Sequence, residues 1–477
     1  MTAPYAFYLD ARFCSGCKAC QAACKDKNDL PPGVLWRRVY EVTGGGWEEA
    51  GPAWTNTVFA YHLSVACNHC VHPKCAGVCP VDAYTVRPDG IVLLDSSLCI
   101  GCGYCAWACP YSVPQYDRSA GTMSKCNFCF DNLDAGLPPA CTAACPMRVL
   151  DYGEAVVDGS ASGLALWEIP AAEHPFPLPD FSRTRPHLSV KPHTAMLLDQ
   201  VKFVANWEEV KPQPRSGWEE APLIAFTLLT QMAVGGFWAM SWMFTPFWLL
   251  LEMDAAWLRL LPSLLVGLTF ALGMIASFKH LGAKKNAWRA VTHLRKSWLS
   301  REILFALLFG SSWLLSTLAI LPWHRTPPVL FWLTALLGFG LVYSMSRVYR
   351  LRAVPAWNTP RTGINFFLST LLLGGLLMSC ILAFESQWTG LRISPLLWKM
   401  VGFGTLILLV FRSWMVHDQA FADAGILWRI LLLAGGLATV FAFFVSGLDP
   451  LSGSLSAFLV IIAGEIVGRW LFYASRP

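Results

Sequence analysis

The hydrophobic and polar positions divide the chain into two unlike parts. Residues 1–220 mix polar, glycine- and proline-rich stretches with short apolar runs, whereas residues 221–477 are nearly continuous apolar runs broken by short loops. A membrane-spanning helix needs about 20 apolar residues. Eight such segments follow one another, at 222–244, 260–280, 302–321, 328–347, 364–384, 395–415, 426–446 and 453–473. Residues 219–477 are therefore predicted to form an all-α membrane domain of eight transmembrane helices.

The first part divides again. Residues 1–152 hold short β-like runs, such as 58–65 and 90–95, between cysteine clusters, and are predicted to form a tandem ferredoxin-like α+β domain. Residues 153–218 are rich in proline and are predicted to be an extended strap and linker. With 55% hydrophobic and 14% charged residues, the chain is too apolar to be wholly soluble. The net charge of +5 is modest, and no basic tract indicates a nucleic-acid partner.

Sixteen of the 17 cysteines lie in the first domain and form four quartets. The first and third quartets have the spacing C-x2-C-x2-C-x3-C, the second has C-x2-C-x4-C-x3-C, and the fourth consists of two pairs with eleven residues between them. The predicted metal ligands are Cys14, Cys17, Cys20, Cys24, Cys67, Cys70, Cys75, Cys79, Cys99, Cys102, Cys105, Cys109, Cys126, Cys129, Cys141 and Cys145.

Sixteen thiolates in this arrangement suit four [4Fe–4S] clusters with four ligands each. Structural zinc, which also uses C-x2-C pairs, is the alternative, but zinc sites do not need a third cysteine two residues later. A disulfide framework belongs to secreted chains, and the first 13 residues show neither a signal peptide nor a twin-arginine pair. We therefore expect iron–sulfur clusters in a domain that is not exported.

The distribution of positive charge predicts the orientation of the membrane domain. With eight spans, fifteen Lys and Arg residues of this domain lie on the side of the cysteine domain and four on the far side. By the positive-inside rule, the cysteine domain faces the cytoplasm. The protein is therefore predicted to be a multi-pass protein of the cytoplasmic (inner) membrane.

Polar residues at membrane depth are costly, and several gather in the leaflet beneath the cysteine domain. His280 ends the second span and Glu302 opens the third, and both offer the hydrogen-bonding and proton-carrying groups that a quinone needs. They are the predicted quinone-site residues, with Gln231, Arg347 and Glu465 as further lining candidates. These three also have simpler explanations as packing or topology anchors.

Haem b is a competing membrane cofactor. It usually takes two histidines that face each other within the spans. The histidines of this domain are His280, His293, His324 and His417, and all lie at span ends or in loops. No haem is therefore expected.

The cysteine motifs CSGCKACQAACKDKNDL, CNHCVHPKCAGVCP, CIGCGYCAWACPYSVPQY and KCNFCF…CTAACP resemble the four-cluster subunit of the dimethyl sulfoxide reductase family of molybdoenzymes. The stretches IASFKHLGAKKNAW, SREI and AGEIVGRWLFY resemble the membrane-anchor subunit of the same family. The resemblance implies that the first and fourth quartets share two clusters, and that the second and third share the other two. It also implies a haem-free anchor, with His280 and Glu302 at the quinone-site positions.

The resemblance implies a non-catalytic redox subunit for anaerobic respiration, in which two subunits are fused. Electrons would pass between menaquinone or ubiquinone, four clusters and a separate molybdopterin-containing catalytic subunit. Two alternatives stay open within the same chemistry: a quinone-reducing cytoplasmic dehydrogenase, such as a sulfite-oxidising enzyme, or a module linked to a hydrogenase or formate dehydrogenase. A zinc-stabilised membrane scaffold without redox function is the alternative from another class.

Overall fold

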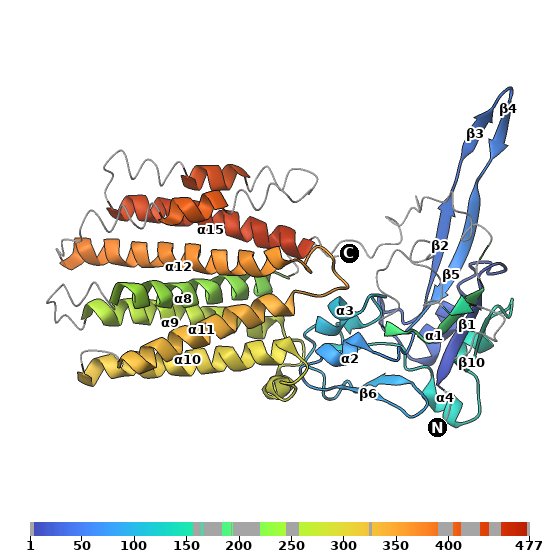
Figure 1. Ribbon diagram of the computed structural model, residues 1–477. Helices are drawn as coiled ribbons and strands as arrows, with labels where there is room; N and C mark the ends of the chain where they lie inside the picture. The colour runs from blue at the N-terminus through green and yellow to red at the C-terminus, as the bar shows by residue number, and fades with distance from the viewer. Residues whose placement is uncertain are drawn as a thin grey trace.

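The computed structural model describes residues 4–155, 164–165, 184–191, 193, 220–244, 257–323, 327–389, 404–411, 430–437 and 450–474. The molecule has two parts, one at each end of its long axis (Figure 1). Long, roughly parallel helices form one part, and short strands and helices around the cysteines form the other. The last helix ends near the cysteine domain.

The cysteine domain contains a four-stranded sheet in the order β10-β1-β12-β11, with bounds Leu150–Glu154, Tyr5–Asp10, Leu188–Lys191 and Leu164–Ala165. Strand β1 pairs antiparallel with β10 and parallel with β12. Its residue Phe7 is buried and stacks on Phe128 with ring centroids 4.1 Å apart. Strands β11 and β12 come from the proline-rich segment for which only a strap was predicted, so part of that segment completes this sheet.

Short helices carry or precede the cysteines. They are α1 (Ala19–Lys27), α2 (Lys74–Val78), α3 (Tyr104–Ala108), α4 (Phe130–Asp134) and α5 (Ala140–Ala143). Isolated helices shorter than about 12 residues are unstable in water. These helices therefore depend on what the cysteines bind and on the hairpins packed around them.

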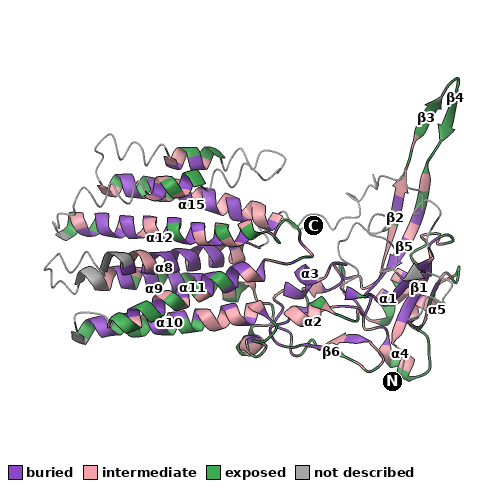
Figure 2. Ribbon diagram, viewed as in Figure 1, coloured by how far each residue is buried: buried purple, intermediate pink, exposed green. Residues whose placement is uncertain are grey.

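Four hairpins connect these helices or project from them. The pairs are β2 (Arg38–Gly44) with β5 (Phe59–Val65), β3 (Trp47–Ala50) with β4 (Ala53–Asn56), β6 (Tyr84–Val86) with β7 (Val92–Leu94), and β8 (Gln115–Asp117) with β9 (Thr122–Ser124). Strands β5 and β7 lie within the runs predicted as β-like. The β3–β4 hairpin extends away from the rest of the protein as an exposed arm (Figures 1 and 2).

The membrane part contains six described helices that are long and apolar enough to span a bilayer. They are α8 (Ala221–Phe244), α9 (Trp257–His280), α10 (Trp298–Trp323), α11 (Pro328–Val348), α12 (Pro360–Thr389) and α15 (Pro450–Ala474). Their positions agree with six of the eight predicted spans. The other two predictions, 395–415 and 426–446, lie largely outside the described residues.

Small residues allow these helices to approach closely. A Cβ atom on Gly235 of α8 would lie 1.8 Å from the carbonyl oxygen of Thr370, and one on Gly374 of α12 would lie 2.0 Å from the carbonyl carbon of Gly235. Membrane helices associate through this type of backbone contact because lipid provides no hydrophobic driving force between them. Helix α8 therefore lies in the centre of the described bundle, where most of its surface is buried (Figure 2).

Helix α3 of the cysteine domain joins the core of the membrane bundle. Its Trp107 is buried and meets the rings of Trp357 and Tyr349 at centroid distances of 5.7 and 6.1 Å. Trp357 is fully buried, and its indole Nε1 donates a hydrogen bond of 2.7 Å to the carbonyl oxygen of Phe472 near the end of α15. One aromatic cluster therefore connects the cysteine domain with the loop before α12 and with α15.

This cluster generates a stability prediction. Substitution Trp107→Ala removes the central ring, and truncation of a buried tryptophan costs roughly 3–5 kcal/mol. We expect the midpoint of thermal unfolding of the full chain in detergent, followed by near-UV circular dichroism, to fall by several degrees. Trp54→Ala, at the exposed arm, is the matched control and should leave the midpoint unchanged. Equal midpoints for the two variants would show that α3 does not stabilise the junction.

Candidate functional site

Two cavities in the cysteine domain are lined by cysteines from different quartets. One is lined by Cys14, Cys17 and Cys20 of the first quartet together with Cys145 of the fourth. The other is lined by the four cysteines Cys67, Cys70, Cys75 and Cys109, three from the second quartet and the last from the third. In each cavity, three closely spaced sulfurs meet a fourth that comes from a distant part of the chain.

The other eight cysteines form two more groups. Burial, together with the nearby thiols of Cys141 and Cys129, raises the pKa of Cys24 to about 12. Cys126 is buried beside Cys24 and Cys141, which completes the third group. The third group therefore consists of Cys24, Cys126, Cys129 and Cys141, and it draws on the first and fourth quartets.

The fourth group contains Cys79, Cys99, Cys102 and Cys105. Burial, with Cys79 and Cys99 adding to it, raises the pKa of Cys102 to about 12. Burial also raises the pKa of Cys105, with Cys102 as the main neighbouring thiol. A buried group of thiols gives up its protons readily only when a cation binds there.

The backbone around the sulfurs fits bound clusters. The amides of Gly101 and Met123 donate hydrogen bonds of 3.3 and 3.4 Å to the sulfur of Cys99, and the amide of Phe128 donates one of 3.4 Å to Cys126. Such bonds stabilise ligand thiolates and tune their reduction potentials. Gly101 has a φ of +70°, a left-handed conformation that turns the chain around the sulfurs.

The sulfur sets fit iron–sulfur cubes. In each of the two cavities, four sulfurs line a shared hollow, and four soft thiolates are the ligand set of a [4Fe–4S] cube. Among the described residues, no three His, Cys, Asp or Glu side chains come together around one metal ion.

Arg37 is a buried cation next to the cysteines of the first and fourth quartets. Burial alone would lower its pKa, but the thiolates of Cys141, Cys126, Cys20 and Cys24 raise it above its ordinary value. The guanidinium lies 4.4 Å from the centroid of the Phe7 ring, and its Nη1 donates a 3.1 Å hydrogen bond to the hydroxyl of Ser64. A fixed positive charge therefore faces these sulfurs.

The group of Cys79, Cys99, Cys102 and Cys105 lies against the membrane part. Three side chains from the end of α9 and the segment before α10 contact the backbone carbonyl oxygens of its cysteines. His280 Nε2 lies 3.3 Å from that of Cys102, Asn286 Nδ2 donates a 3.0 Å bond to that of Cys99, and His293 Nδ1 lies 2.7 Å from that of Cys79. These contacts join residues up to 214 positions apart in the sequence.

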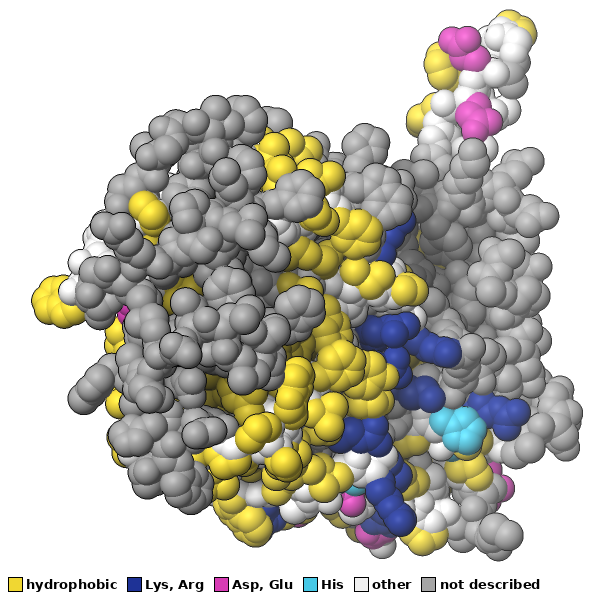
Figure 3. All heavy atoms as spheres, turned by 60° about the vertical axis from the view of Figure 1, so that its left-hand side comes forward, with side chains coloured by type: hydrophobic (Ala, Val, Ile, Leu, Met, Phe, Trp, Pro, Cys, Tyr) yellow, Lys and Arg dark blue, Asp and Glu magenta, His cyan; other side chains and the backbone are white. Residues whose placement is uncertain are grey.

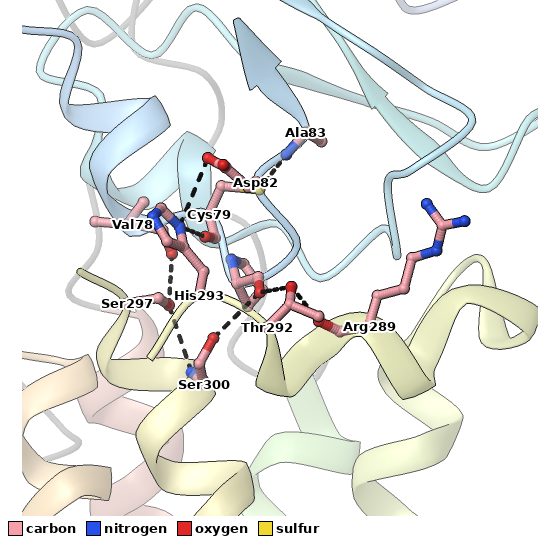
Figure 4. A network of polar contacts seen from close by, with 10 residues as sticks. Val78, Cys79, Asp82, Ala83, Arg289, Thr292, His293, Ser297 and Ser300 are labelled. Carbon is pink, nitrogen blue, oxygen red and sulfur yellow. Dashed lines mark hydrogen bonds and ion pairs between the residues drawn. The ribbon is translucent and has the colours of Figure 1, made fainter. Parts of the chain in front are cut away.

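Serines extend this junction, as Figure 4 shows around His293. The hydroxyl of Ser297 donates a 2.8 Å bond to the carbonyl oxygen of Val78, and that of Ser300 donates a 3.2 Å bond to Pro80. His293 also lies 3.8 Å from a carboxylate oxygen of Asp82. The membrane part therefore holds the backbone on both sides of Cys79.

Glycines bring the two backbones together next to His280. A Cβ on Gly282 would lie 2.0 Å from the carbonyl oxygen of Gly121, and one on Gly101 would lie 2.3 Å from the same atom. The motif His280-Leu281-Gly282 therefore needs its glycine because any side chain there would separate the loop from the cysteines.

The predicted residues His280 and Glu302 lie near one short segment, residues 102–104. Besides its contact with Cys102, His280 lies with Nδ1 3.6 Å from a carboxylate oxygen of Glu220. Glu302 is 3% exposed, and its Oε1 has no hydrogen-bond partner among the described residues. The pKa of Tyr104 is raised, mainly by burial and then by the charge of Glu302, so these two residues are near each other.

The three further candidates lie at different places. The amide oxygen of Gln231 accepts a 2.8 Å bond from Arg469, and Glu465 accepts a 2.8 Å bond from the hydroxyl of Ser369, both in the bundle interior. Arg347 lies with its guanidinium 5.0 Å from the ring centroid of Trp298 and lines a groove between α11 and α12.

The sequence reasoning missed several residues around Glu302. Nothing in the sequence pattern gives Glu220 a role at the start of the membrane domain, and Tyr104 reads only as a spacer between cysteines. Tyr473 donates a 2.6 Å hydrogen bond to the hydroxyl of Tyr349, and Glu220 and Glu302 both lie within electrostatic reach of Tyr473. The one signal in the sequence concerns Glu220, an acidic residue directly before an apolar run.

Comparisons with known families match both parts of the protein. The family described as "DMSO reductase anchor subunit (DmsC)" matches residues 215–474. The family described as "4Fe-4S dicluster domain" matches residues 58–155.

Curated proteins resemble the cysteine part. The B component of the anaerobic dimethyl sulfoxide reductase of Escherichia coli is 42% identical over 218 residues, which are 44% of this chain and 100% of that protein. Its counterpart in Haemophilus influenzae is 42% identical over 215 residues, 43% of this chain and 98% of that protein. The formate dehydrogenase iron–sulfur subunit of Wolinella succinogenes is 38% identical over 172 residues, 31% of this chain and 80% of that protein.

The position of Arg37 generates a prediction. Substitution Arg37→Gln removes a buried cation that favours the reduced, more negative state of nearby clusters. We expect their potentials, measured by EPR redox titration, to fall by on the order of 50 mV, which is about 1.2 kcal/mol for one electron. The control Arg38→Gln changes the adjacent, less buried arginine and should leave the reduction potentials of the clusters unchanged. Unchanged or higher potentials in Arg37→Gln would contradict this electrostatic role.

Proposed function

This protein belongs to the DMSO reductase anchor subunit family, fused to an iron–sulfur chain of the same enzyme type, and we propose that it exchanges electrons with membrane quinone. It is an electron-transfer and membrane-anchor subunit of a molybdoenzyme complex. The catalytic partner carries the molybdopterin, and this chain supplies the quinol half-reaction of anaerobic respiration.

One observation carries the proposal: His280 at the end of a membrane helix lies 3.3 Å from the carbonyl oxygen of Cys102. A residue with proton-carrying chemistry therefore contacts the backbone of a predicted cluster ligand. Electrons released at membrane depth have a short path into the cysteine domain at this point.

The residues around His280 suit the proton chemistry of quinol oxidation. The carbonyl oxygen of Cys102 only accepts hydrogen bonds, so Nε2 of His280 carries the proton that faces it. Nδ1 then takes up a proton from the substrate, and the carboxylate of Glu220, 3.6 Å away, stabilises the resulting imidazolium. Glu302, with one oxygen unpaired among the described residues, is the acceptor for the second quinol hydroxyl.

The remaining candidates support this site from the bundle interior. Gln231 and Glu465 bond to Arg469 and Ser369, and we assign them to the wall of the quinone site. Arg347 lines a separate groove but is near Tyr104, where its positive charge opposes the effect of Glu302 on the pKa of Tyr104. Its charge therefore also acts on the proposed quinone site.

Four [4Fe–4S] clusters, one in each cysteine group, would supply one-electron carriers between the quinone and the partner. In this proposal, the cluster of the Cys102 group is the one next to the membrane, because His280 contacts Cys102, and the cluster of the group with the exposed Cys17 is at the surface. The tandem ferredoxin-like arrangement of residues 1–152 and the strap 153–218 are part of this proposal.

The orientation follows from charge. A band of Lys and Arg side chains lies between the apolar surface of the helices and the cysteine domain (Figure 3). Positive charge of this kind stays on the cytoplasmic side, so we place the cysteine domain there. Helix α12 runs away from that side and α15 returns to it, which an even number of further spans preserves, and we propose the two spans 395–415 and 426–446 between them.

The quinone site generates a functional prediction. We expect His280→Ala and Glu302→Gln each to lower quinol-dependent turnover of the complex at least tenfold, because loss of a proton carrier typically costs 10²–10⁴-fold. Turnover driven by a soluble reductant that feeds the clusters directly should stay unchanged. The matched control is Glu385→Gln, which alters another buried acid near the C-terminal end of α12 and should leave quinol turnover unchanged. Normal quinol turnover in both site variants would rule out this assignment.

The topology generates a second prediction. An epitope inserted between Gly51 and Pro52, at the exposed arm, should bind antibody in inside-out vesicles and not in right-side-out ones. An epitope at residues 416–425 should behave in the same way if the chain has eight spans, whereas one at 324–326 should show the opposite behaviour. Six spans would move the 416–425 epitope to the far side, and a reversed arm signal would overturn the cytoplasmic orientation.

A further inference from the structure

A groove lies between the end of α11 and the start of α12, and we call it the arginine groove. Its cavity volume is about 380 Å³, and the groove is open on one side to the surroundings. A water molecule occupies about 30 Å³, so the groove accommodates a headgroup and the start of an acyl chain. Its two cationic members are Arg347 and Arg350, one turn apart on the cysteine-domain side of the bundle.

Both arginines retain unused hydrogen-bonding capacity. The Nε atoms of Arg347 and Arg350 are buried and have no hydrogen-bond partner among the described residues. No carboxylate is among the side chains that line the groove in the described part of the chain. Two arginines thus line one groove that no described carboxylate lines, so an anion in the groove is electrostatically favourable.

The walls of the groove are apolar and face outwards. Ile364 and Leu371 of α12 are 42% and 45% exposed, and Tyr343 of α11 is 44% exposed. In a membrane bundle such surfaces face acyl chains. Phe367 and Leu368 continue the apolar wall from the arginines along α12.

The first turn of α12 also lines the groove, at Pro360 and Gly363. The first amides of a helix have no partner within the helix, and this end carries partial positive charge. A Cβ on Gly363 would meet only the hydroxyl of Ser346, 3.9 Å away, so the backbone there is open to a ligand. The helix end adds to the positive potential that the arginines create.

We propose that the arginine groove binds one anionic phospholipid of the surrounding leaflet. Its phosphate lies between Arg347 and Arg350, and an acyl chain lies along Ile364, Phe367 and Leu371. Basic pockets between membrane helices on the cytoplasmic side recognise anionic headgroups in this way. A quinone is a poorer occupant because its neutral carbonyls do not offset two positive charges. A free phosphate ion would gain nothing from the apolar walls.

The site is tested by lipid titration of the purified full chain in detergent, with bound lipids counted by native mass spectrometry. We expect phosphatidylglycerol to bind and phosphatidylcholine not to bind at matched concentrations. The double variant Arg347→Gln/Arg350→Gln should lower the affinity for phosphatidylglycerol about 30-fold, since each cation near an anionic lipid contributes roughly a fivefold effect. Arg347→Lys/Arg350→Lys retains both charges and should retain most of the binding.

The matched control is Lys284→Gln/Lys285→Gln, which removes two exposed charges from the same side of the membrane and should not change lipid binding. EPR spectra of the clusters report whether each variant is folded. Equal binding of the two lipids by the wild type, or equal phosphatidylglycerol binding by the glutamine variant, would overturn the proposal. Displacement of the lipid by a quinone analogue that no longer binds to the glutamine variant would assign the groove to quinone instead.

Discussion

The contact between the cysteine segment 99–105 and the membrane part is the constraint on which the other features depend. Side chains of the α9–α10 region contact the carbonyl oxygens of three cysteines of one group, at Cys79, Cys99 and Cys102. Because they hold the backbone and leave the sulfurs free, the sulfurs stay available for iron. Gly101 and Gly282 permit this approach, since a side chain at either position would collide with backbone. The junction therefore sets the distance between the membrane residues and the nearest cluster.

Polar groups are also buried in the interior of the bundle. Unpaired polar atoms in an apolar interior are costly, and several side chains here bond to each other, such as Arg469 with Gln231 and Glu465 with Ser369. Oε1 of Glu302, which has no hydrogen-bond partner in the described part of the chain, lies beside α3, where the cysteine domain closes the bundle. An unsatisfied acid at this boundary is easier to reconcile with ligand binding than with packing. Fusion of the two parts in one chain keeps the boundary intact at any protein concentration.

Local patterns could be predicted from the sequence, and long-range contacts could not. The spacing of Cys99, Cys102 and Cys105 predicts ligands because it lies within a few residues, and the apolar runs identified six of the spans for the same reason. Spacing alone could not say that Cys145 joins Cys14, a pairing that only the resemblance implied. Glu220 was missed because its partner His280 is 60 positions away, and strand β12 because prolines surround it.

The segment at the end of α11 faces two environments. Tyr349 points into the aromatic core with Trp107 and Trp357, while Arg347 and Arg350 line the groove on another face. Helix α11 ends at Val348, Tyr349 caps it and Arg350 follows, so the end of the helix lets these side chains face different surroundings. A bound anion on one face would offset the charge of the arginines and hold the segment in place. The aromatic contact with α3 on the other face would then be stabilised by a lipid that touches neither the clusters nor the quinone.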